Sequence, residues 1–397
     1  MRLFRNLPGT VVVFGIVSLL TDISSEMIYP LLPLFLSASL GAGPAFLGII
    51  EGVAESTAAL LKLYSGFLAD RVKSRKGLVL AGYTISSLAR PMMAFAGSAL
   101  QVLAIRFVDR SGKGVRSSPR DAMIADCVEY GDRGRAFGFH RSMDHAGALI
   151  GPLLAAALIY TVTDDLRTVF LLSAIPGLLA VVLIVLKVRD KPVQPHPDAL
   201  PTHLGKIPSG HFRTYLLVLF LFTLGNSSDA FLLLKASHAG IPPARIALLW
   251  AFFHVIKMLS VMPFGALSDG IGRRKIIVAG WTVYSLAYAG FAFATSESQI
   301  WGLFGVYGLF YGLTEGVEKA LVADLVPLGE RGRAFGWFNF AIAAGALPAS
   351  LLFGLIWQQA GSAAAFLFGS GLAAVAALLL LAGLPTDEHA APASNRP

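Results

Sequence analysis

Long apolar segments follow one another along almost the whole chain, and only short polar turns separate most of them. A helix needs about 20 predominantly apolar residues to cross the hydrocarbon core of a bilayer. Of the 397 residues, 55% are hydrophobic and 14% are charged, whereas a soluble domain carries about 25% charged residues. The chain therefore has too few polar side chains to cover a soluble surface, and its length accommodates about a dozen membrane-spanning helices.

The apolar segments predict an all-α membrane protein with twelve transmembrane helices. We expect these helices at residues 8–37, 45–69, 77–97, 101–127, 135–161, 166–188, 213–237, 244–267, 276–295, 300–326, 334–359 and 363–384. The sixth and seventh segments are separated by a long polar stretch rich in proline, a composition typical of a linker. The predicted organisation is an N-terminal six-helix bundle at 1–188, a cytoplasmic linker at 189–212, a C-terminal six-helix bundle at 213–384 and a cytoplasmic tail at 385–397.

Positive charges are concentrated in alternate loops of this arrangement. The clusters are Arg2/Arg5, Arg71/Lys73/Arg75/Lys76, Lys187/Arg189/Lys191, Arg273/Arg274/Lys275 and Arg331/Arg333. The turns between them, around 37–44, 97–101 and 361–364, carry no charge. This alternation follows the positive-inside rule and predicts a multi-pass protein of the inner membrane with both termini in the cytoplasm. Because the formal charge of +8 is distributed in this way, we do not expect a nucleic-acid partner.

The two halves of the chain repeat the same short motifs. Gly66-Phe-Leu-Ala-Asp70 returns as Gly265-Ala-Leu-Ser-Asp269, Arg133-Gly-Arg-Ala-Phe-Gly138 returns as Arg331-Gly-Arg-Ala-Phe-Gly336, and Ser24-Ser25-Glu26 has its counterpart in Ser227-Ser228-Asp229. Matching positions lie 198 to 203 residues apart, so the repeat covers half of the chain. Two six-helix repeats with a binding site between them near mid-membrane are an architecture of secondary transporters.

At these residues the chain resembles the major facilitator superfamily, and the resemblance extends over essentially its whole length. The loop signature of that family is matched by Gly66, Leu68, Asp70, Arg71 and Arg75, and again by Gly265, Leu267, Asp269, Gly272, Arg273 and Arg274. Lys73, Ser74 and Gly270 depart from it. Charged groups in both loops predict a latch that holds the cytoplasmic side closed and breaks for inward opening.

Two further helices carry motifs of the same family. The fourth predicted helix is similar through Arg106, Phe107, Gly112 and Gly114. The fifth resembles a motif of proton-driven drug antiporters through Gly147, Gly151 and Pro152, with alanine in place of its last two glycines. The resemblance implies export rather than uptake. Small residues let helices approach closely and proline bends a helix, so a rocking interface and ordinary helix packing both fit.

The fourth predicted helix also carries a stripe of charge. Arg106, Asp109, Arg110, Lys113, Arg116 and Arg120 fall within roughly 120° of its circumference. Charged residues within a span usually face a water-filled cavity or one another. The stripe therefore favours an anionic or zwitterionic solute, although acids on other helices leave a lipophilic cation open. Arg116 and Arg120 fit equally well as cations that extend to the membrane surface.

Other predicted helices carry acids and a few cations. We expect Asp22, Glu26, Asp229 and Arg106 to take part in proton coupling, and Arg110, Lys113, Glu51, Glu55, Glu315, Glu318, His254 and Lys257 to line the substrate cavity. A carboxylate beside cations in a low-dielectric site can bind a proton in one conformation and release it in another. The alternative for each acid is an ion pair that joins two helices.

His140 and Asp144 share one face of the fifth predicted helix, a spacing that two metal ligands can use. We favour the pairing of Asp144 and Arg141 with charges on the fourth helix, and we predict neither a metal site nor a cofactor. The partners expected are a small-molecule substrate, protons and the lipid bilayer, with the monomer as the functional form.

The sequence thus predicts a proton-coupled antiporter that works by alternating access and exports a small anionic or zwitterionic organic solute. An uptake symporter for an organic anion or a siderophore-like solute is the alternative. An intramembrane enzyme is disfavoured, because the chain contains no G-x-S-x-G, H-E-x-x-H or P-loop motif. A receptor without transport activity on the same scaffold stays open.

Overall fold

The computed structural model describes residues 7–72, 74–128, 133–189, 207, 210–326 and 331–383, and no strand occurs among them. The predicted tail at 385–397 and most of the predicted linker at 189–212 lie outside these residues. The helices of the first half are α1 (Gly9–Glu26), η2 (Tyr29–Leu31), α2 (Leu32–Leu34), η3 (Phe35–Ser39), α3 (Pro44–Arg71), α4 (Arg75–Ala89), η4 (Arg90–Phe95), α5 (Ala99–Ala125), α6 (Arg133–Thr161), α7 (Leu166–Leu172) and α8 (Ala174–Lys187).

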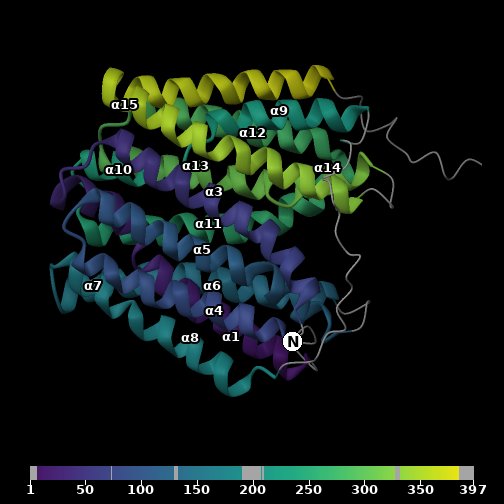
Figure 1. Ribbon diagram of the computed structural model, residues 1–397. Helices are drawn as coiled ribbons and strands as arrows, with labels where there is room; N and C mark the ends of the chain where they lie inside the picture. The colour runs from purple at the N-terminus through teal and green to yellow at the C-terminus, as the bar shows by residue number, and fades with distance from the viewer. Residues whose placement is uncertain are drawn as a thin grey trace, which may run out of the picture. The chain divides into compact units, whose positions relative to one another are not determined.

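The second half is helical in the same way (Figure 1). Its helices are α9 (His211–Gly225), α10 (Ala230–His238), α11 (Pro243–Ile271), α12 (Arg273–Phe293), α13 (Glu297–Thr314), α14 (Val317–Asp324) and α15 (Arg331–Gly383). The long α15 contains Gly361 at φ 90°, a left-handed conformation that is not helical. This residue lies between the predicted helices 334–359 and 363–384, in the turn expected around 361–364.

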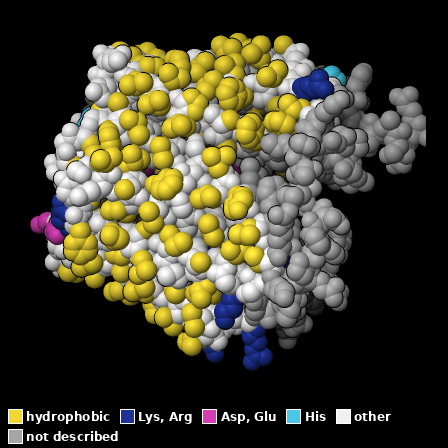
Figure 2. Space-filling view, viewed as in Figure 1, with side chains coloured by type: hydrophobic (Ala, Val, Ile, Leu, Met, Phe, Trp, Pro, Cys, Tyr) yellow, Lys and Arg dark blue, Asp and Glu magenta, His cyan; other side chains and the backbone are white. Residues whose placement is uncertain are grey.

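Nine helical stretches of the described residues are long and apolar enough to cross a membrane. They include Gly9–Ser39, which contains α1, η2, α2 and η3, and His211–His238, which contains α9 and α10. Helix α5 is not among the nine, because its charge stripe lowers its hydropathy. Figure 2 shows hydrophobic side chains over most of the visible face, with few Lys and Arg side chains among them. The prediction of an all-α membrane protein is confirmed.

Side-chain caps fix several helix starts. Ser98 accepts a hydrogen bond from the backbone N–H of Gln101 at the start of α5. Ser296 and Gln299 form a reciprocal capping box at the start of α13. Asp165 accepts from two backbone N–H groups at the start of α7. Such caps satisfy N–H groups that the first turn of a helix leaves without a partner.

The chain packs into two compact units. Unit 1 contains Met1–Ala42, Val53–Leu200 and Ile241–Ala251, and unit 2 contains Gly43–Gly52, Pro201–Gly240 and Phe252–Pro397. Each unit therefore includes about ten residues of a helix from the other half of the chain, from α11 in unit 1 and from α3 in unit 2. In unit 2 a Cβ on Gly354 would lie 2.5 Å from the carbonyl oxygen of Pro44, so α15 and the start of α3 pack backbone to backbone.

In unit 1, α1 packs against α6 and α8, and α4 packs against α5 and α8 (Figure 1). The crossing of α4 and α5 is especially close. A Cβ on Gly82 would lie 2.6 Å from the carbonyl oxygen of Gly112, and a Cβ on Gly112 would lie 2.6 Å from that of Gly82. In unit 2, α15 packs against α9 and α12, and α12 packs against α13. The close crossing with α4 fixes the position of α5 and of its charge stripe.

We predict that Gly112→Val destabilises the protein, because its side chain would clash with the backbone carbonyl oxygen of Gly82 and the backbone nitrogen of Ser86. The expected loss in the free energy of unfolding is about 1–3 kcal/mol, the scale of overpacking. Gly302→Val is the matched control, since a Cβ at that helical position meets nothing within 4 Å. Thermal unfolding in detergent measures both variants. Equal melting temperatures for the two would contradict the close crossing of α4 and α5.

Candidate functional site

The first span of each half is interrupted beside an acidic residue. Helix α1 ends at Glu26, and the next helical segment begins at Tyr29. Helix α9 ends at Gly225, residues 226–228 are not helical, and Asp229 directly precedes α10. Interrupted helices near mid-membrane expose backbone groups and side chains for binding ions or solutes in transporters. The repeated motifs Ser-Ser-Glu and Ser-Ser-Asp therefore lie at equivalent interruptions.

Helix α6 presses its small residues against the acids of α1. A Cβ on Gly147 would lie 2.8 Å from the Cβ of Asp22, and a Cβ on Gly151 would lie 2.8 Å from the Cβ of Glu26. Pro152 follows within the same helix. The glycines thus let α6 reach the segment of α1 that carries both carboxylates, as the small-residue motif predicts.

Glu26 contacts an aromatic pair of unit 1. The indole N–H of Trp250 donates to the Glu26 carboxylate at 2.8 Å. The Trp250 ring lies 5.3 Å from that of Tyr29, and the guanidinium of Arg106 lies 5.7 Å from the centroid of the Tyr29 ring. Glu26 and Arg106 are both predicted site residues. Glu26 contacts Trp250, Trp250 contacts Tyr29, and Arg106 lies over the Tyr29 ring.

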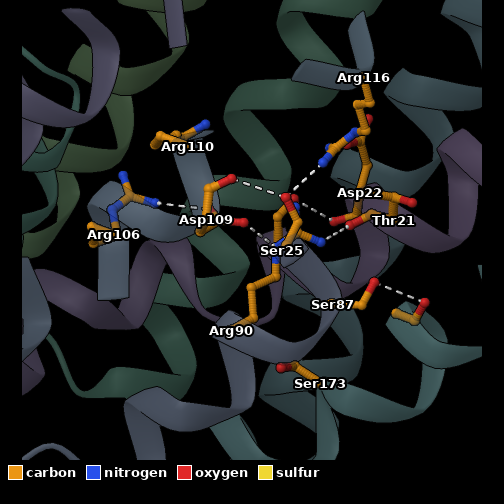
Figure 3. Close-up of polar contacts among 12 residues, drawn as sticks. Thr21, Asp22, Ser25, Ser87, Arg90, Arg106, Asp109, Arg110, Arg116 and Ser173 are labelled. Carbon is orange, nitrogen blue, oxygen red and sulfur yellow. Dashed lines mark hydrogen bonds and ion pairs between the residues drawn. The ribbon is translucent and has the colours of Figure 1, made fainter. Parts of the chain in front are cut away.

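A buried ion cluster surrounds Asp109 (Figure 3). Arg90 Nε lies 3.0 Å from one oxygen of the Asp109 carboxylate, and Arg106 Nη1 lies 4.0 Å from the other. Arg90 also donates to the backbone carbonyl of Thr21 at 2.8 Å, one residue before Asp22. Only about 5% of the surface of Arg90, Arg106 or Asp109 is exposed. The cluster joins α1, η4 and α5 beside the predicted proton-coupling acids.

Arg116 continues the cluster along α5. Its guanidinium donates to Ser86 at 2.7 Å and lies 4.4 Å from the centroid of the Tyr83 ring. Ser86 in turn donates to the backbone carbonyl of Asp109 at 2.9 Å. Arg116 is buried at 4% exposure, so the alternative that it extends to the membrane surface is wrong. The charge stripe therefore has a buried edge that packs against α4.

The other edge of the stripe is accessible. Arg110 Nη2 lies 3.6 Å from the carboxylate of Glu55 on α3, and half of the Glu55 side chain is exposed. Lys113 is also exposed. A charge in a span does not face hydrocarbon without a large cost, so these side chains face a polar region. All three are predicted cavity residues of unit 1, and the exposure of this edge comes from Lys113 and Glu55, since only 12% of the Arg110 side chain is exposed.

Asp144 on α6 contacts α1 and residues of its own helix. It accepts a short hydrogen bond from Ser18, and it lies 3.3 Å from Arg141 and 3.5 Å from His140. These three contacts are with α1 and α6, and the pairing of Asp144 with charges on the fourth span stays a prediction. Within the described ranges, no group of three His, Cys, Asp or Glu side chains is arranged to hold a metal ion.

Unit 2 places its acids against aromatic donors. Asp229 accepts from Tyr307 at 2.5 Å and from Tyr311 at 3.1 Å. Glu318 accepts from the indole N–H of Trp281 at 3.0 Å. Glu51, which is buried and packs in unit 2, accepts from Ser228 at 3.2 Å. These contacts bring Glu51 and Asp229 to one place, whereas Glu55 pairs within unit 1.

The remaining predicted cations of unit 2 lie on α11. Lys257 Nζ is 3.3 Å from the carboxylate of Glu315 and 4.2 Å from the centroid of the Tyr311 ring. The rings of His254 and Phe253 are 5.2 Å apart and roughly perpendicular. Lys257 and Glu315 thus form an ion pair, and their place in a substrate cavity stays a prediction.

The loop signatures form equivalent ion pairs in the two units. Arg75 lies 2.5 Å from Asp126, and Arg273 lies 2.5 Å from Asp324, at matching positions of the repeat. Arg273 also lies 2.9 Å from Asp269. Both pairs connect the start of one helix with the end of another in the same unit. These ion pairs do not test the predicted latch, which stays a prediction.

The other described residues of the loop signatures differ in their surroundings. Arg274 donates to the backbone carbonyl of Leu381 at 3.4 Å. Gly66 approaches Ser118 of α5, and a Cβ on Gly265 would meet nothing within 4 Å. The side chains of Asp70 and Arg71 lie outside the described part of the chain.

Sequence reasoning missed Arg90 and Trp250. Arg90 is the one cation of its apolar segment from 77 to 97, and an isolated arginine within a span is a signal for a buried partner. Trp250 carried no such signal, because its role depends on the packing of the first residues of α11 in unit 1.

The chain matches a sequence profile described as Major Facilitator Superfamily over residues 14–235 and 215–397. It is 33% identical over 388 residues to an uncharacterized MFS-type transporter of Methanocaldococcus jannaschii, and 95% of each chain is covered. It is 22% identical to the multidrug resistance protein MdtH of Aeromonas hydrophila, with 83% of each chain covered.

Solved structures show the same fold at low sequence identity. The nucleoside transporter NupG matches with a TM-score of 0.77 at 14% identity, over 94% of this chain and 98% of NupG. A POT family transporter in complex with 5-aminolevulinic acid matches with a TM-score of 0.79 at 13% identity, over 96% of each chain.

We predict that Asp109→Asn costs about 3–5 kcal/mol of stability, because it leaves buried guanidinium groups without their counter-charge. Glu55→Gln removes an acid from an accessible ion pair and is expected to cost about 0–1 kcal/mol. Thermal unfolding of both variants in detergent checks the difference. A smaller loss for Asp109→Asn than for Glu55→Gln would show that the buried cluster is not a structural support.

Proposed function

Because the chain belongs to the major facilitator superfamily and is therefore a multi-pass membrane transporter, we propose that it exchanges protons for a small organic solute by alternating access. The observation that carries this proposal is the equivalent position of Glu26 and Asp229. Each acid lies where the first span of its half is interrupted, and each accepts hydrogen bonds from aromatic donors. Paired acids at such interruptions are suited to ion coupling.

Asp22 and Glu26 are the proposed proton carriers of unit 1. They lie one turn apart on α1, where Asp22 packs against Gly147 of α6 and Glu26 packs against Gly151. A movement of α6 along α1 changes the packing around both carboxylates. Burial and nearby charge set the proton affinity of a carboxylate, so such a movement couples conformation to proton binding. Arg106 contributes through the cation cluster that borders this segment.

The accessible edge of the α5 stripe is the proposed solute contact in unit 1. Arg110 and Lys113 offer positive charge there, and Glu55 balances part of it. An anionic or zwitterionic solute fits this edge. In unit 2, Glu51, Glu315, Glu318, His254 and Lys257 are the proposed solute contacts.

Export is the proposed direction. The motif at Gly147, Gly151 and Pro152 is the one that resembles drug antiporters, and a relative at 22% identity is named as a multidrug resistance protein. Uptake by symport is the second candidate, since the same carboxylates serve protons that move with the solute.

The loop signatures are proposed to act as a latch, through the ion pairs of Arg75 and Arg273. We further propose that the protein acts as a monomer in the inner membrane with both termini in the cytoplasm, as the positive-inside pattern predicts.

We predict that Glu26→Gln and Asp22→Asn abolish solute movement driven by a pH gradient and preserve solute exchange at equal pH. The reason is that exchange needs the binding site and the conformational change, whereas the gradient acts only through groups that titrate. The measurement uses proteoliposomes with an imposed pH gradient and a panel of anionic, zwitterionic and cationic solutes. Asp164→Asn, in the exposed turn after α6, is the control.

The direction of proton movement separates the candidates. Protons that move opposite to the solute establish antiport, and protons that move with it establish the uptake symporter. Solute flux without proton movement would overturn proton coupling and leave Asp22 and Glu26 with a structural role.

A further inference from the structure

Five side chains of unit 2 form one continuous network around Tyr311. Tyr307 and Tyr311 both donate to Asp229, at 2.5 Å and 3.1 Å. Lys257 lies over the Tyr311 ring at 4.2 Å from its centroid, and its ammonium is 3.3 Å from Glu315. The network therefore connects two carboxylates, two phenols and one resident ammonium group through successive contacts.

The chemistry of this network is that of a site for an organic ammonium group. Two hydroxyl donors hold the Asp229 carboxylate in one orientation, and charge-assisted hydrogen bonds are stronger than neutral ones. The face of a tyrosine ring attracts cations because of its quadrupole, most strongly where water is excluded. Tyr307 and Phe253 are buried and line Tyr311 with ring centroids 5.6 Å away from it. Carboxylate and aromatic face together recognise positive charge.

Lys257 shows that the Tyr311 face accepts an ammonium group. Its side chain is a flexible stem with rotatable bonds, and its partner Glu315 has 36% of its side chain exposed. In unit 1 the comparable cation is Arg106, which lies over Tyr29 but also borders the buried Asp109. Arg106 is thus fixed by a buried cluster, whereas Lys257 can swing away from Tyr311 and stay near Glu315.

We propose that Asp229 and the face of Tyr311 form a binding site for the ammonium group of the transported solute, and that Lys257 covers the ring while the site is empty. The proposal rests on the transport function proposed above and narrows its solute to one with an amino or substituted ammonium group. Of the anionic and zwitterionic solutes proposed above, a zwitterion with an amino group carries the charge that this site recognises. Asp229 then takes part in solute binding in addition to its proposed part in proton coupling.

The test measures binding of three probes with the same four-carbon chain to the purified full-length protein in detergent. The probes are n-butylammonium, butyrate and n-butanol, and the methods are isothermal titration calorimetry and thermal shift. We expect saturable binding of n-butylammonium only. Asp229→Asn and Tyr311→Leu are expected to weaken it about tenfold or more, the scale of a lost charge-assisted contact.

The most specific outcome concerns Lys257→Met. This variant removes the resident ammonium and keeps the length of the side chain, so n-butylammonium is expected to bind several-fold more tightly. Lys319→Met is the matched control, since it removes a positive charge from an exposed position of α14. Tyr311→Phe keeps the ring and loses only its hydroxyl, so it is expected to bind more tightly than Tyr311→Leu.

Equal binding of n-butylammonium and n-butanol, or an affinity for n-butylammonium that Lys257→Met leaves unchanged or weakens, would overturn the proposal. The proteoliposome assay keeps this failure separate from failure of the transport proposal. Proton-coupled flux of a solute without an amino group, in a protein that does not bind n-butylammonium, overturns the ammonium site alone. Tighter binding in Lys257→Met supports the site even where no proton movement is found, and in that event only proton coupling falls.

Discussion

A polar group inside a bilayer has no water to bond with, so it must find its partners within the protein. This constraint governs the interior of both units. Arg90 and Arg106 both lie beside the buried carboxylate of Asp109 in unit 1, and Arg90 also donates to the backbone of α1 beside Asp22. Removing one partner of such a cluster leaves a buried charge, which costs far more than the cluster contributes as a whole. The arrangement of α1, η4 and α5 therefore depends on these contacts.

Close helix crossings bring the buried polar groups near enough to contact their partners. Gly82 and Gly112 bring α4 and α5 into backbone contact, and Gly147 and Gly151 do the same for α6 and α1. The acids of α1 thus lie in one close helix contact, and the arginines of α5 lie beside another. In the proposed transport cycle the contact of α6 with α1 is the one that moves, on a framework that stays fixed.

The internal repeat is present in the side-chain contacts of the two units as well as in the sequence. Arg75 and Asp126 in unit 1 correspond to Arg273 and Asp324 in unit 2, and both pairs are 2.5 Å apart. Glu26 and Asp229 each lie at an interrupted span and accept hydrogen bonds from aromatic side chains. The repeats nevertheless differ in charge, since α5 carries the arginine stripe and unit 2 surrounds its acid with tyrosines. The two units thus place different side-chain chemistry at equivalent positions of the repeat.

The sequence by itself determined the fold class, the repeat and the approximate span boundaries, because hydropathy, small-residue spacing and loop charge are local properties of the chain. It also singled out Asp22, Glu26 and Asp229 as candidates, since an acid within an apolar segment is visible without a structure. Only the tertiary structure decided which partner each charge has. Trp250 bonds to Glu26 across more than 200 residues, and Arg116 is buried against Tyr83 although its position on α5 also fitted the membrane surface. Burial and long-range pairing depend on how helices cross, and no local pattern encodes the crossing.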